Sequence, residues 1–428
     1  MTDALRSQRE KRPRGVLGGR RYRRPEAARP RSATLESICA WLASRALEAG
    51  SPIKLIDGLS WRMVAAGLPV DRCGVTVALL HPQFSGYGIR WWRDTADADE
   101  LLVEHQVFES EPFRRSPFPA VVDDGETVRV RIDPGAPAFP YPVIAELAAQ
   151  GYRDYVAMPV RLKSIAAAGQ QRRFQACVFA TRRAEGFSDA DIAALARIVD
   201  ALAAPLALAT ERRMARDLLA VYLGPMVAPR VLSGEIKRGS GETLRAAILA
   251  TDMRGFTPLT DRLRPERIAE ILNAWFEGQV RAVHEEGGEV LKFMGDGMLA
   301  IFPIADVELS RRPVRQALAA ARRIIDWAET LDHDPAFADA RPLRAVAALH
   351  VGDVFHGNIG SPDRLDFTAI GPGVNLVMRL ETLAKTLGRD LILSAPFADL
   401  CDASLVPLGR HALKGVAEPI EAFGCAPG

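Results

Sequence analysis

Two carboxylates stand at the ends of apolar stretches in the second half of the chain. Asp252 follows an apolar run in AAILATDMRGFT, and Asp296 lies in the Gly-Asp-Gly turn of VLKFMGDGMLAIF. Singly, each has an ordinary explanation, because acidic residues favour turns and Gly-Asp-Gly suits a tight hairpin. Together they predict a metal site, since two carboxylates that meet repel each other unless cations hold them. Mg²⁺ prefers one or two carboxylates combined with phosphate oxygens.

The elements around these carboxylates follow a βαββαβ order. Apolar periodicity predicts, in order, a strand at 245–252, a helix at 264–285, a hairpin at 288–304, a helix at 308–331, strands at 343–352 and 365–370, a helix at 373–387, a strand at 391–394, and two strand-like pieces at 405–414 and 419–424. This order predicts an α+β fold with a ferredoxin-like core. In such a sheet the first strand lies beside the hairpin, so both carboxylates reach one edge.

Four further polar residues could act on a phosphate ester near that edge. Lys292 lies on the strand that leads into the hairpin turn, Thr368 lies on a strand, and the helix after Gly-Pro-Gly carries Asn375 and Arg379. The last two are four residues apart and share a helix face. An Arg suits the charge of a phosphoryl transition state. The simpler alternatives are a Lys292–Asp296 ion pair, a salt bridge of Arg379 and a surface Asn.

Three motifs in this region resemble one family, the class III nucleotide cyclases. The chain reads DMRGFT, KFMGDG and TAIGPGVNLVMR, in the family's order and at compatible spacing, and the resemblance covers about 244–424. It implies that Asp252 and Asp296 hold two Mg²⁺ or Mn²⁺ ions per active site. It also implies that Lys292 and Thr368 read the purine, that Asn375 orients the ribose, and that Arg379 neutralises the α-phosphate.

The same resemblance implies a substrate, an assembly and a set of phosphate contacts. Lys with Thr is the adenine-reading pair, so the chain resembles adenylate cyclases that convert ATP to 3′,5′-cyclic AMP and pyrophosphate. The site forms across a head-to-tail homodimer, with the two Asp residues from one chain and the other four from its partner. The candidates for holding the β- and γ-phosphates are Gly255, Phe256, Thr257 and Lys414. A guanylate cyclase and a non-catalytic nucleotide sensor remain the alternatives.

The first half of the chain has a different organisation. Helical patterns at 34–50 and 52–67, strand-like runs from 74 to 181 and a long helix from about 189 to 220 resemble a GAF-like domain over 34–210. No ligand motif stands out, so the small molecule or protein that would regulate such a domain is not indicated. Gly, Pro and Ser cluster after 220, and residues 211–243 are therefore interpreted as a helical linker to a catalytic domain at 244–428.

The N-terminal residues 1–33 are strongly basic. Residues 1–32 hold eleven Lys or Arg against three Asp or Glu, so a net charge of +2 divides into +8 here and −6 elsewhere. Few large apolar residues and many Pro and Gly predict a disordered tail. Contact with nucleic acid or an anionic membrane is one function for it, and a solvated extension is the simpler one. Scattered cysteines and the lack of a secretory leader pattern predict a cytoplasmic protein.

Overall fold

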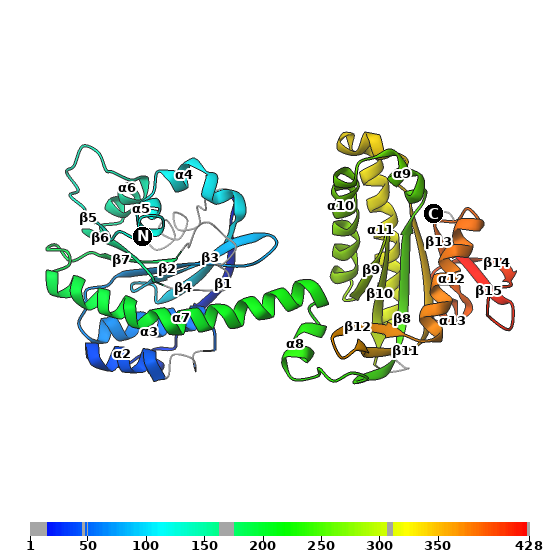
Figure 1. Cartoon of the computed structure of the whole chain (residues 1–428), viewed down its shortest axis with the longest axis horizontal. Coiled ribbons are helices and arrows are strands. Elements are labelled where there is room, and N and C mark those ends of the chain that lie inside the picture. The colour runs from blue at the N-terminus through cyan, green and yellow to red at the C-terminus, as the bar shows by residue number, and fades with distance from the viewer. Residues whose placement is uncertain (1–14, 45–47, 49, 162–174, 306–310, 426–428) are drawn as a thin grey trace. The chain divides into compact units, whose positions relative to one another are not determined.

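The computed structural model describes residues 15–44, 48, 50–161, 175–305 and 311–425. The chain divides into two compact units, Met1–Leu218 and Leu219–Gly428 (Figure 1). The boundary falls inside the predicted linker 211–243.

The first unit is built on an antiparallel sheet with helices on both faces. The strand order is β1-β4-β3-β2-β7-β6-β5. The strands are β1 (Val16–Arg23), β2 (Arg72–Ala78), β3 (Phe84–Trp92), β4 (Asp97–Glu104), β5 (Val128–Arg131), β6 (Asp154–Pro159) and β7 (Gln175–Thr181). The helices are α2 (Leu35–Ser44), α3 (Pro52–Ala65), α4 (Glu111–Arg114), α5 (Phe118–Val122), α6 (Pro142–Ala149) and α7 (Asp189–Leu223), with short 3₁₀ turns at Glu26–Ala28 and His105–Glu109. Helices α2, α3 and α7 form one apolar core with the sheet, and α5 and α6 form another.

The prediction of a disordered tail at 1–33 is wrong for the part that the structure describes. Val16–Arg23 forms β1, which pairs antiparallel with β4 at the edge of the sheet. The reason is charge complementarity, since Arg21 and Arg23 form ion pairs with Asp99 and Asp97 of β4 at 3.0 and 2.7 Å. These arginines are engaged within the chain, which weakens the case for a nucleic-acid or membrane arm; residues 1–14 lie outside the described residues.

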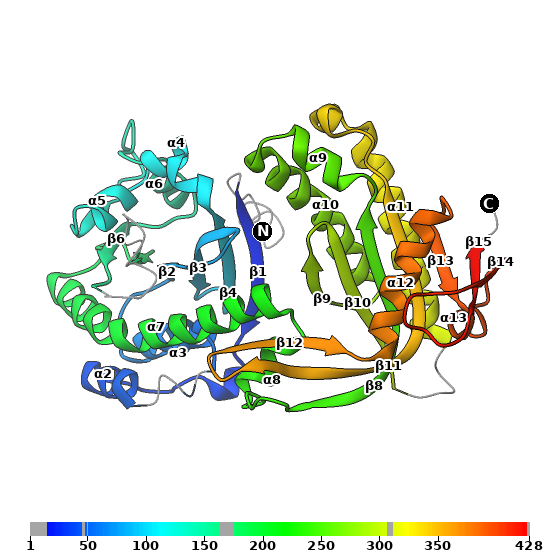
Figure 2. The same cartoon turned by 45° about the vertical axis from the view of Figure 1, so that its right-hand side comes forward.

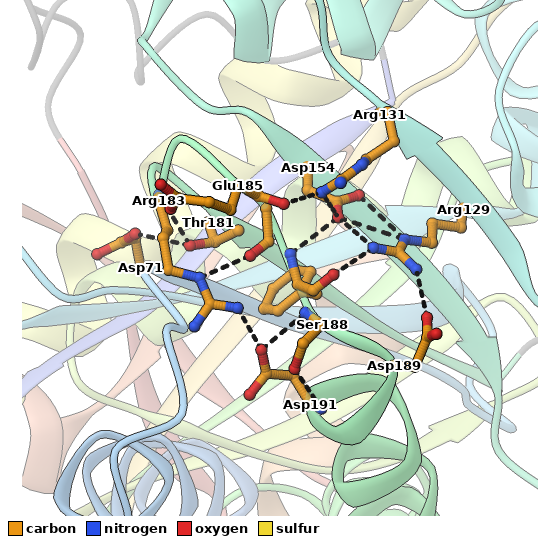
Figure 3. A network of polar contacts seen from close by, with 12 residues as sticks. Asp71, Arg129, Arg131, Asp154, Thr181, Arg183, Glu185, Ser188, Asp189 and Asp191 are labelled. Atoms are coloured by element: carbon orange, nitrogen blue, oxygen red, sulfur yellow. Dashed lines mark hydrogen bonds and ion pairs between the residues drawn. The ribbon is translucent and has the colours of Figure 1, made fainter.

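A buried carboxylate anchors the start of α7. Asp154 is fully buried, and Figure 3 shows the guanidinium groups of Arg129 and Arg131 converging on it. The distances from Asp154 Oδ2 are 2.8 Å to Arg129 and 3.2 Å to Arg131. The backbone N–H of Phe187, two residues before α7, donates to the same oxygen at 3.0 Å. The start of β6 is thereby tied to the segment that leads into α7.

Helix α7 is apolar and long. By length and composition it meets the criteria for a membrane-crossing helix, with 33% of its most apolar window buried. Its buried side chains pack into the core of the first unit, and they include Leu195, Ile198, Leu202 and Leu206. A core helix meets the same criteria, and this packing explains the apolar composition. The long helix predicted from about 189 to 220 is confirmed.

The second unit contains the predicted βαββαβ core, which the structure confirms. Its strands are β8 (Gly241–Met253), β9 (Glu289–Met294), β10 (Gly297–Ile304), β11 (Ala345–Ser361), β12 (Arg364–Ile370), β13 (Leu391–Ser394), β14 (Leu405–His411) and β15 (Ile420–Cys425). Its helices are α8 (Val227–Leu232), α9 (Phe256–Arg262), α10 (Pro265–Glu285), α11 (Arg311–His333), α12 (Pro372–Thr386) and α13 (Ala395–Ala398), with a 3₁₀ turn at Pro335–Ala340. The sheet order is β14-β15-β13-β11-β8-β10-β9, and β12 extends from β11.

The two faces of this sheet are covered differently. The amphipathic helices α10 and α11 form an apolar core with one face, around residues such as Trp275 and Phe302. Helix α12 covers the other face over β8 and β11, with Val377 and Leu380 buried (Figure 2). Strand β8 is central and is buried along its apolar run, so Asp252 near its end has a rigid support.

Candidate active site

The structure brings Asp252 and Asp296 together, as the sequence predicts. Asp252 lies at the end of β8, opposite Val346 of β11, and Asp296 lies in the turn between β9 and β10, which flanks β8 on its other side. The backbone N–H of Met253 donates to Asp296 Oδ2 at 3.0 Å. Burial raises the pKa of Asp296 to about 7, and a hydrogen bond with Asp252 and the charge of Asp252 add to that shift.

The hairpin tip is held in place by its backbone. Gly297 pairs with Met294, so Gly295 and Asp296 form a two-residue loop. Gly295 has a φ of 66°, a conformation that glycine adopts without steric cost and that the first position of a tight hairpin loop needs. The carbonyl of Asp296 accepts a hydrogen bond of 3.0 Å from the indole N–H of Trp275, a fully buried residue of α10. The carboxylate therefore points from a fixed turn.

Lys385 is a functional candidate that the sequence reasoning missed. Its ammonium lies 2.5 Å from Asp252 Oδ2 and 2.8 Å from Glu381 Oε1, one helical turn earlier on α12. Burial acts to lower the pKa of Lys385, but the hydrogen bonds to these two carboxylates outweigh it and raise the pKa. The spacing of Glu381 and Lys385, four residues apart on a helix, was the available sequence signal.

Lys292 and Thr368 lie on two different strands, β9 and β12. Lys292 is half-buried on β9, directly after a bulge in which Leu291 has no partner opposite it on β10. Bulges redirect neighbouring side chains and are frequent beside active sites. Thr368 lies on β12 opposite Gly357, is 5% exposed, and its hydroxyl has no hydrogen-bond partner among the described residues. A buried hydroxyl of this kind can serve a ligand.

Asn375 and Arg379 lie on α12, as predicted. Asn375 is exposed in the first turns of the helix, and Arg379 is half-buried one turn later. Arg379 Nη1 is buried and has no hydrogen-bond partner among the described residues. The guanidinium packs beneath Gly415, where an added Cβ would lie 3.0 Å from Nη1. The predicted salt-bridge alternative for Arg379 has no support within the described part of the chain.

The candidate phosphate contacts lie on two loops. Gly255, with a φ of 74°, is the N-cap of α9, and Phe256 and Thr257 begin that helix three residues after the end of the buried strand. The neighbouring N–H of Arg254 is already bonded to the carbonyl of Arg344 at 2.9 Å. Lys414 is exposed in the loop between β14 and β15, next to Gly415. Their contact with phosphate stays a prediction.

Only part of the predicted constellation meets within one chain. Among the described residues, no hydrogen bond or ion pair joins Asp252 or Asp296 to Lys292, Thr368, Asn375 or Arg379. The Lys292–Asp296 ion pair considered from sequence is likewise not formed there. The described chain contains no cluster of three or more His, Cys, Asp or Glu side chains suited to a metal ion. Two adjacent carboxylates that repel each other, one already neutralised by an ammonium, do fit a divalent cation completed by substrate oxygens.

Comparison with known proteins adds to this geometry. No model of a known protein family matches the chain. It is 32% identical over 238 residues to an uncharacterized protein of Mycobacterium tuberculosis (strain ATCC 25618 / H37Rv), across 55% of this chain and 41% of that protein. It is 27% identical over 179 residues to adenylate cyclase 1 of Rhizobium meliloti (strain 1021), across 40% of this chain and 26% of that protein.

A solved structure of a bacterial light-regulated adenylyl cyclase is 26% identical to the chain, with a TM-score of 0.45, across 51% of this chain and 62% of that one. The alignments to the two curated relatives span less than half of those proteins. Sequence similarity to a named adenylate cyclase, together with two carboxylates that meet at a hairpin tip, supports a nucleotide cyclase domain in this chain.

Proposed function

We propose that this chain is an adenylate cyclase that converts ATP to 3′,5′-cyclic AMP and pyrophosphate. The observation that carries the proposal is the meeting of Asp252 and Asp296 beside the end of β8, where burial, a hydrogen bond with Asp252 and the charge of Asp252 raise the pKa of Asp296. Such a pair is costly unless a cation neutralises it. Two Mg²⁺ or Mn²⁺ ions, when bound there, supply Lewis acidity toward the ribose 3′-oxygen and the triphosphate.

The residues of the chain orient the nucleotide for in-line attack of the 3′-oxygen on the α-phosphorus. Asn375 holds the ribose, and Arg379 donates to the α-phosphate, where negative charge develops as the bond to pyrophosphate breaks. A rigid α12 favours this role, because both side chains share its face. The backbone N–H groups at Gly255, Phe256 and Thr257, with Lys414, hold the outer phosphates.

Lys292 and Thr368 select adenine over guanine. The Lys292 ammonium donates to adenine N1, and the Thr368 hydroxyl accepts from the N6 amino group. Guanine presents an N1–H donor and an O6 acceptor at these places, so it meets the wrong partners. The unpartnered hydroxyl of Thr368 supports this assignment.

The active site forms between two copies of the chain. Asp252 and Asp296 come from one protomer, and the other four residues come from its partner. The lack of a hydrogen bond or ion pair between these two sets, among the residues that the structure describes, supports the arrangement. A head-to-tail homodimer then has two equivalent sites.

Product analysis tests the activity. Purified chain is incubated with ATP or with GTP and Mn²⁺, beside the Asp296→Ala variant, and the products are separated by chromatography. Cyclic AMP from the wild type and none from the variant is the expected result. Cyclic GMP alone would overturn the adenine assignment and keep the mechanism. No cyclic product from either nucleotide, including with a fragment of residues 219–428, would favour a non-catalytic nucleotide sensor.

Mixing two inactive variants tests the shared site. Asp296→Ala and Arg379→Ala are each expected to be inactive alone. Co-refolded or co-expressed in equal amounts, they form mixed dimers with one intact site, which restores about a quarter of the wild-type activity by random pairing. If the mixed dimers, verified by tag pull-down, show no activity above background, a site shared between protomers is contradicted.

The first unit regulates the second through α7 in this proposal. The helix starts in the first unit and ends at Leu223 in the second, so it is the covalent connection between them. A GAF-like identity of the first unit stays a prediction. Removing residues 1–218 is expected to change the specific activity or the dimer affinity, measured by product formation and analytical ultracentrifugation. If neither quantity changes, the first unit has no regulatory role.

A further inference from the structure

Helix α12 carries two pairs of functional side chains at one-turn spacing. Asn375 and Arg379 occupy its first half, and Glu381 and Lys385 occupy its second half. The second pair reaches the carboxylate site of its own chain through Lys385 and Asp252. One helix therefore links the candidate metal carboxylates of a protomer to the residues proposed for its partner's site.

Lys385 is the cation that balances a crowded group of carboxylates. Asp252 and Asp296 are within hydrogen-bonding reach of each other, and Glu381 is only 5% exposed at its side chain. The ammonium contacts both Asp252 and Glu381, at 2.5 and 2.8 Å, while its own side chain is 36% exposed. Asp252 and Glu381 thus share one ammonium, and without it the buried Glu381 charge would lose its partner.

We propose that Lys385 occupies the place of a metal ion at Asp252 in the metal-free protein and is displaced when a divalent cation binds. This inference rests on the proposed function, because it takes Asp252 and Asp296 as the metal ligands. An ammonium on Asp252 Oδ2 prevents the same lone pairs from coordinating a metal. Displaced from Asp252, Lys385 keeps its contact with Glu381, which lies on the same helix and does not depend on Asp252.

Lys385 is therefore a positioning residue that holds the carboxylates ready without metal. It stabilises the carboxylate pair before the ion arrives, so the site does not have to assemble during binding. The cost is a weaker affinity for the metal, because a bound ammonium must first be released and its charge stays nearby. Removing the charge should lower the stability of the metal-free site and raise its affinity for the metal. An ordinary surface ion pair would not produce both changes.

The test measures Mn²⁺ binding by isothermal titration calorimetry on the full chain without nucleotide. Lys385→Met keeps the length of the side chain and removes the charge. It is expected to bind Mn²⁺ about tenfold more tightly than the wild type, since a unit charge a few ångströms from a divalent ion costs at least 1 kcal/mol even in water. Thermal unfolding is expected to show a lower midpoint without metal and a larger increase with Mn²⁺ than in the wild type.

Two controls and one replacement variant complete the test. Lys237→Met removes a lysine charge at an exposed position of the same unit and is expected to leave Mn²⁺ affinity unchanged. Lys385→Arg keeps the charge and is expected to stay near wild-type affinity. Lys385→Gln, which can hydrogen-bond to both carboxylates, replaces the Met variant if that variant does not fold.

The outcomes separate this inference from the proposed function. Unchanged or weaker Mn²⁺ binding by the folded uncharged variant would overturn the displacement of Lys385. Equal Mn²⁺ binding by the wild type and by Asp252→Asn, or none by the wild type, would overturn the metal site itself and this inference with it.

Discussion

Two aspartates, one in each unit, have opposite electrostatic surroundings, and Asp154 is buried whereas Asp296 is half-buried. Asp154 of the first unit accepts from two guanidinium groups and from a backbone N–H, and every one of these donors lies in its own unit. Asp296 of the second unit accepts from one backbone N–H and has another carboxylate as its neighbour. Two positive charges surround the single negative charge of Asp154, whereas Asp296 has another negative charge as its neighbour.

The difference separates a structural carboxylate from a candidate catalytic one. A buried charge that serves only the fold gains from complete pairing, because an unpaired one costs several kcal/mol. A carboxylate that must bind an ion from solution cannot be saturated in advance. Asp252 is intermediate between these two cases, because it is paired with a single cation, Lys385, which we propose is displaced by the metal ion.

The largest expected effect is on the saturated aspartate. Asp154→Ala leaves Arg129 and Arg131 without their shared partner, and we expect it to lower the free energy of unfolding of the first unit by about 3–5 kcal/mol. Denaturant unfolding of the full chain, followed by circular dichroism, measures this loss. Asp189→Ala, whose exposed side chain lies 3.8 Å from Arg129, is the control and should leave that unfolding transition unchanged. Equal losses of unfolding free energy in both variants would show that Asp154 is no more important to the fold than an exposed aspartate.

A buried histidine in the second unit gives a pH effect of known sign. Burial lowers the pKa of His350 to about 4, and the charge of Arg245 adds to it. The unfolded chain takes up a proton near pH 6.5 and the folded chain does not, so stability is full above pH 6.5 and is lost as the pH falls toward 4. The loss is at most about 3 kcal/mol. His350→Gln should flatten this part of the stability–pH curve, and an unchanged slope would refute the assignment.

Asp296 should show the opposite slope. Its pKa is raised to about 7 in the fold, so the folded chain binds more protons than the unfolded chain between about pH 4 and 7, and stability falls as the pH rises through that range. Asp296→Asn should remove this fall and make the metal-free protein about 1–2 kcal/mol more stable at pH 8 than the wild type, after allowance for solvent screening. Urea unfolding at pH 5 and 8 with a chelator measures it. If Asp296→Asn is less stable than the wild type at pH 8, the charge of Asp296 stabilises the fold, as that of Asp154 does.

The smallest expected effect concerns the turn that holds Asp296. Gly295→Ala forces a side chain into a positive φ and should cost about 1 kcal/mol, although nothing lies within 4 Å of the added Cβ. Gly295→Asn, a residue that tolerates this conformation, should cost less. Thermal unfolding of both variants measures the difference. Equal stability of all three proteins would show that the turn is not strained and that the hydrogen bonds from Trp275 and Met253 are enough to position Asp296.

The second unit could be predicted from sequence because its elements agree with local pattern. The strand expected at 391–394 is β13, and the expected helix at 373–387 is α12 within one residue. The meeting of Asp252 and Asp296 followed from the βαββ order alone. The extension of β11 to Ser361, well past the predicted 352, did not, because it depends on pairing with β12 and with the start of β8.

The first unit shows where local pattern fails. Strand β4 reads DADELLVE and β1 reads VLGGRRYR, and neither has the apolar alternation of a strand. The two strands carry opposite charges that pair across a sequence distance of about eighty residues, and β4 also pairs with β3 on its other side. Lys385 was missed for a similar reason, since a lysine near a helix end is usually solvated and only its distant partner Asp252 gives it a role.

Strand β1 also determines how the chain should be cut. A boundary placed at residue 34, as composition suggests, would remove β1 and leave the whole length of β4 as an open edge with unpaired backbone groups. Open edges recruit other strands, and arginines on an edge strand discourage that. Strand β1 thus protects β4 from pairing with other chains. Truncated proteins that begin after β1 should precipitate under conditions in which the full chain stays in solution.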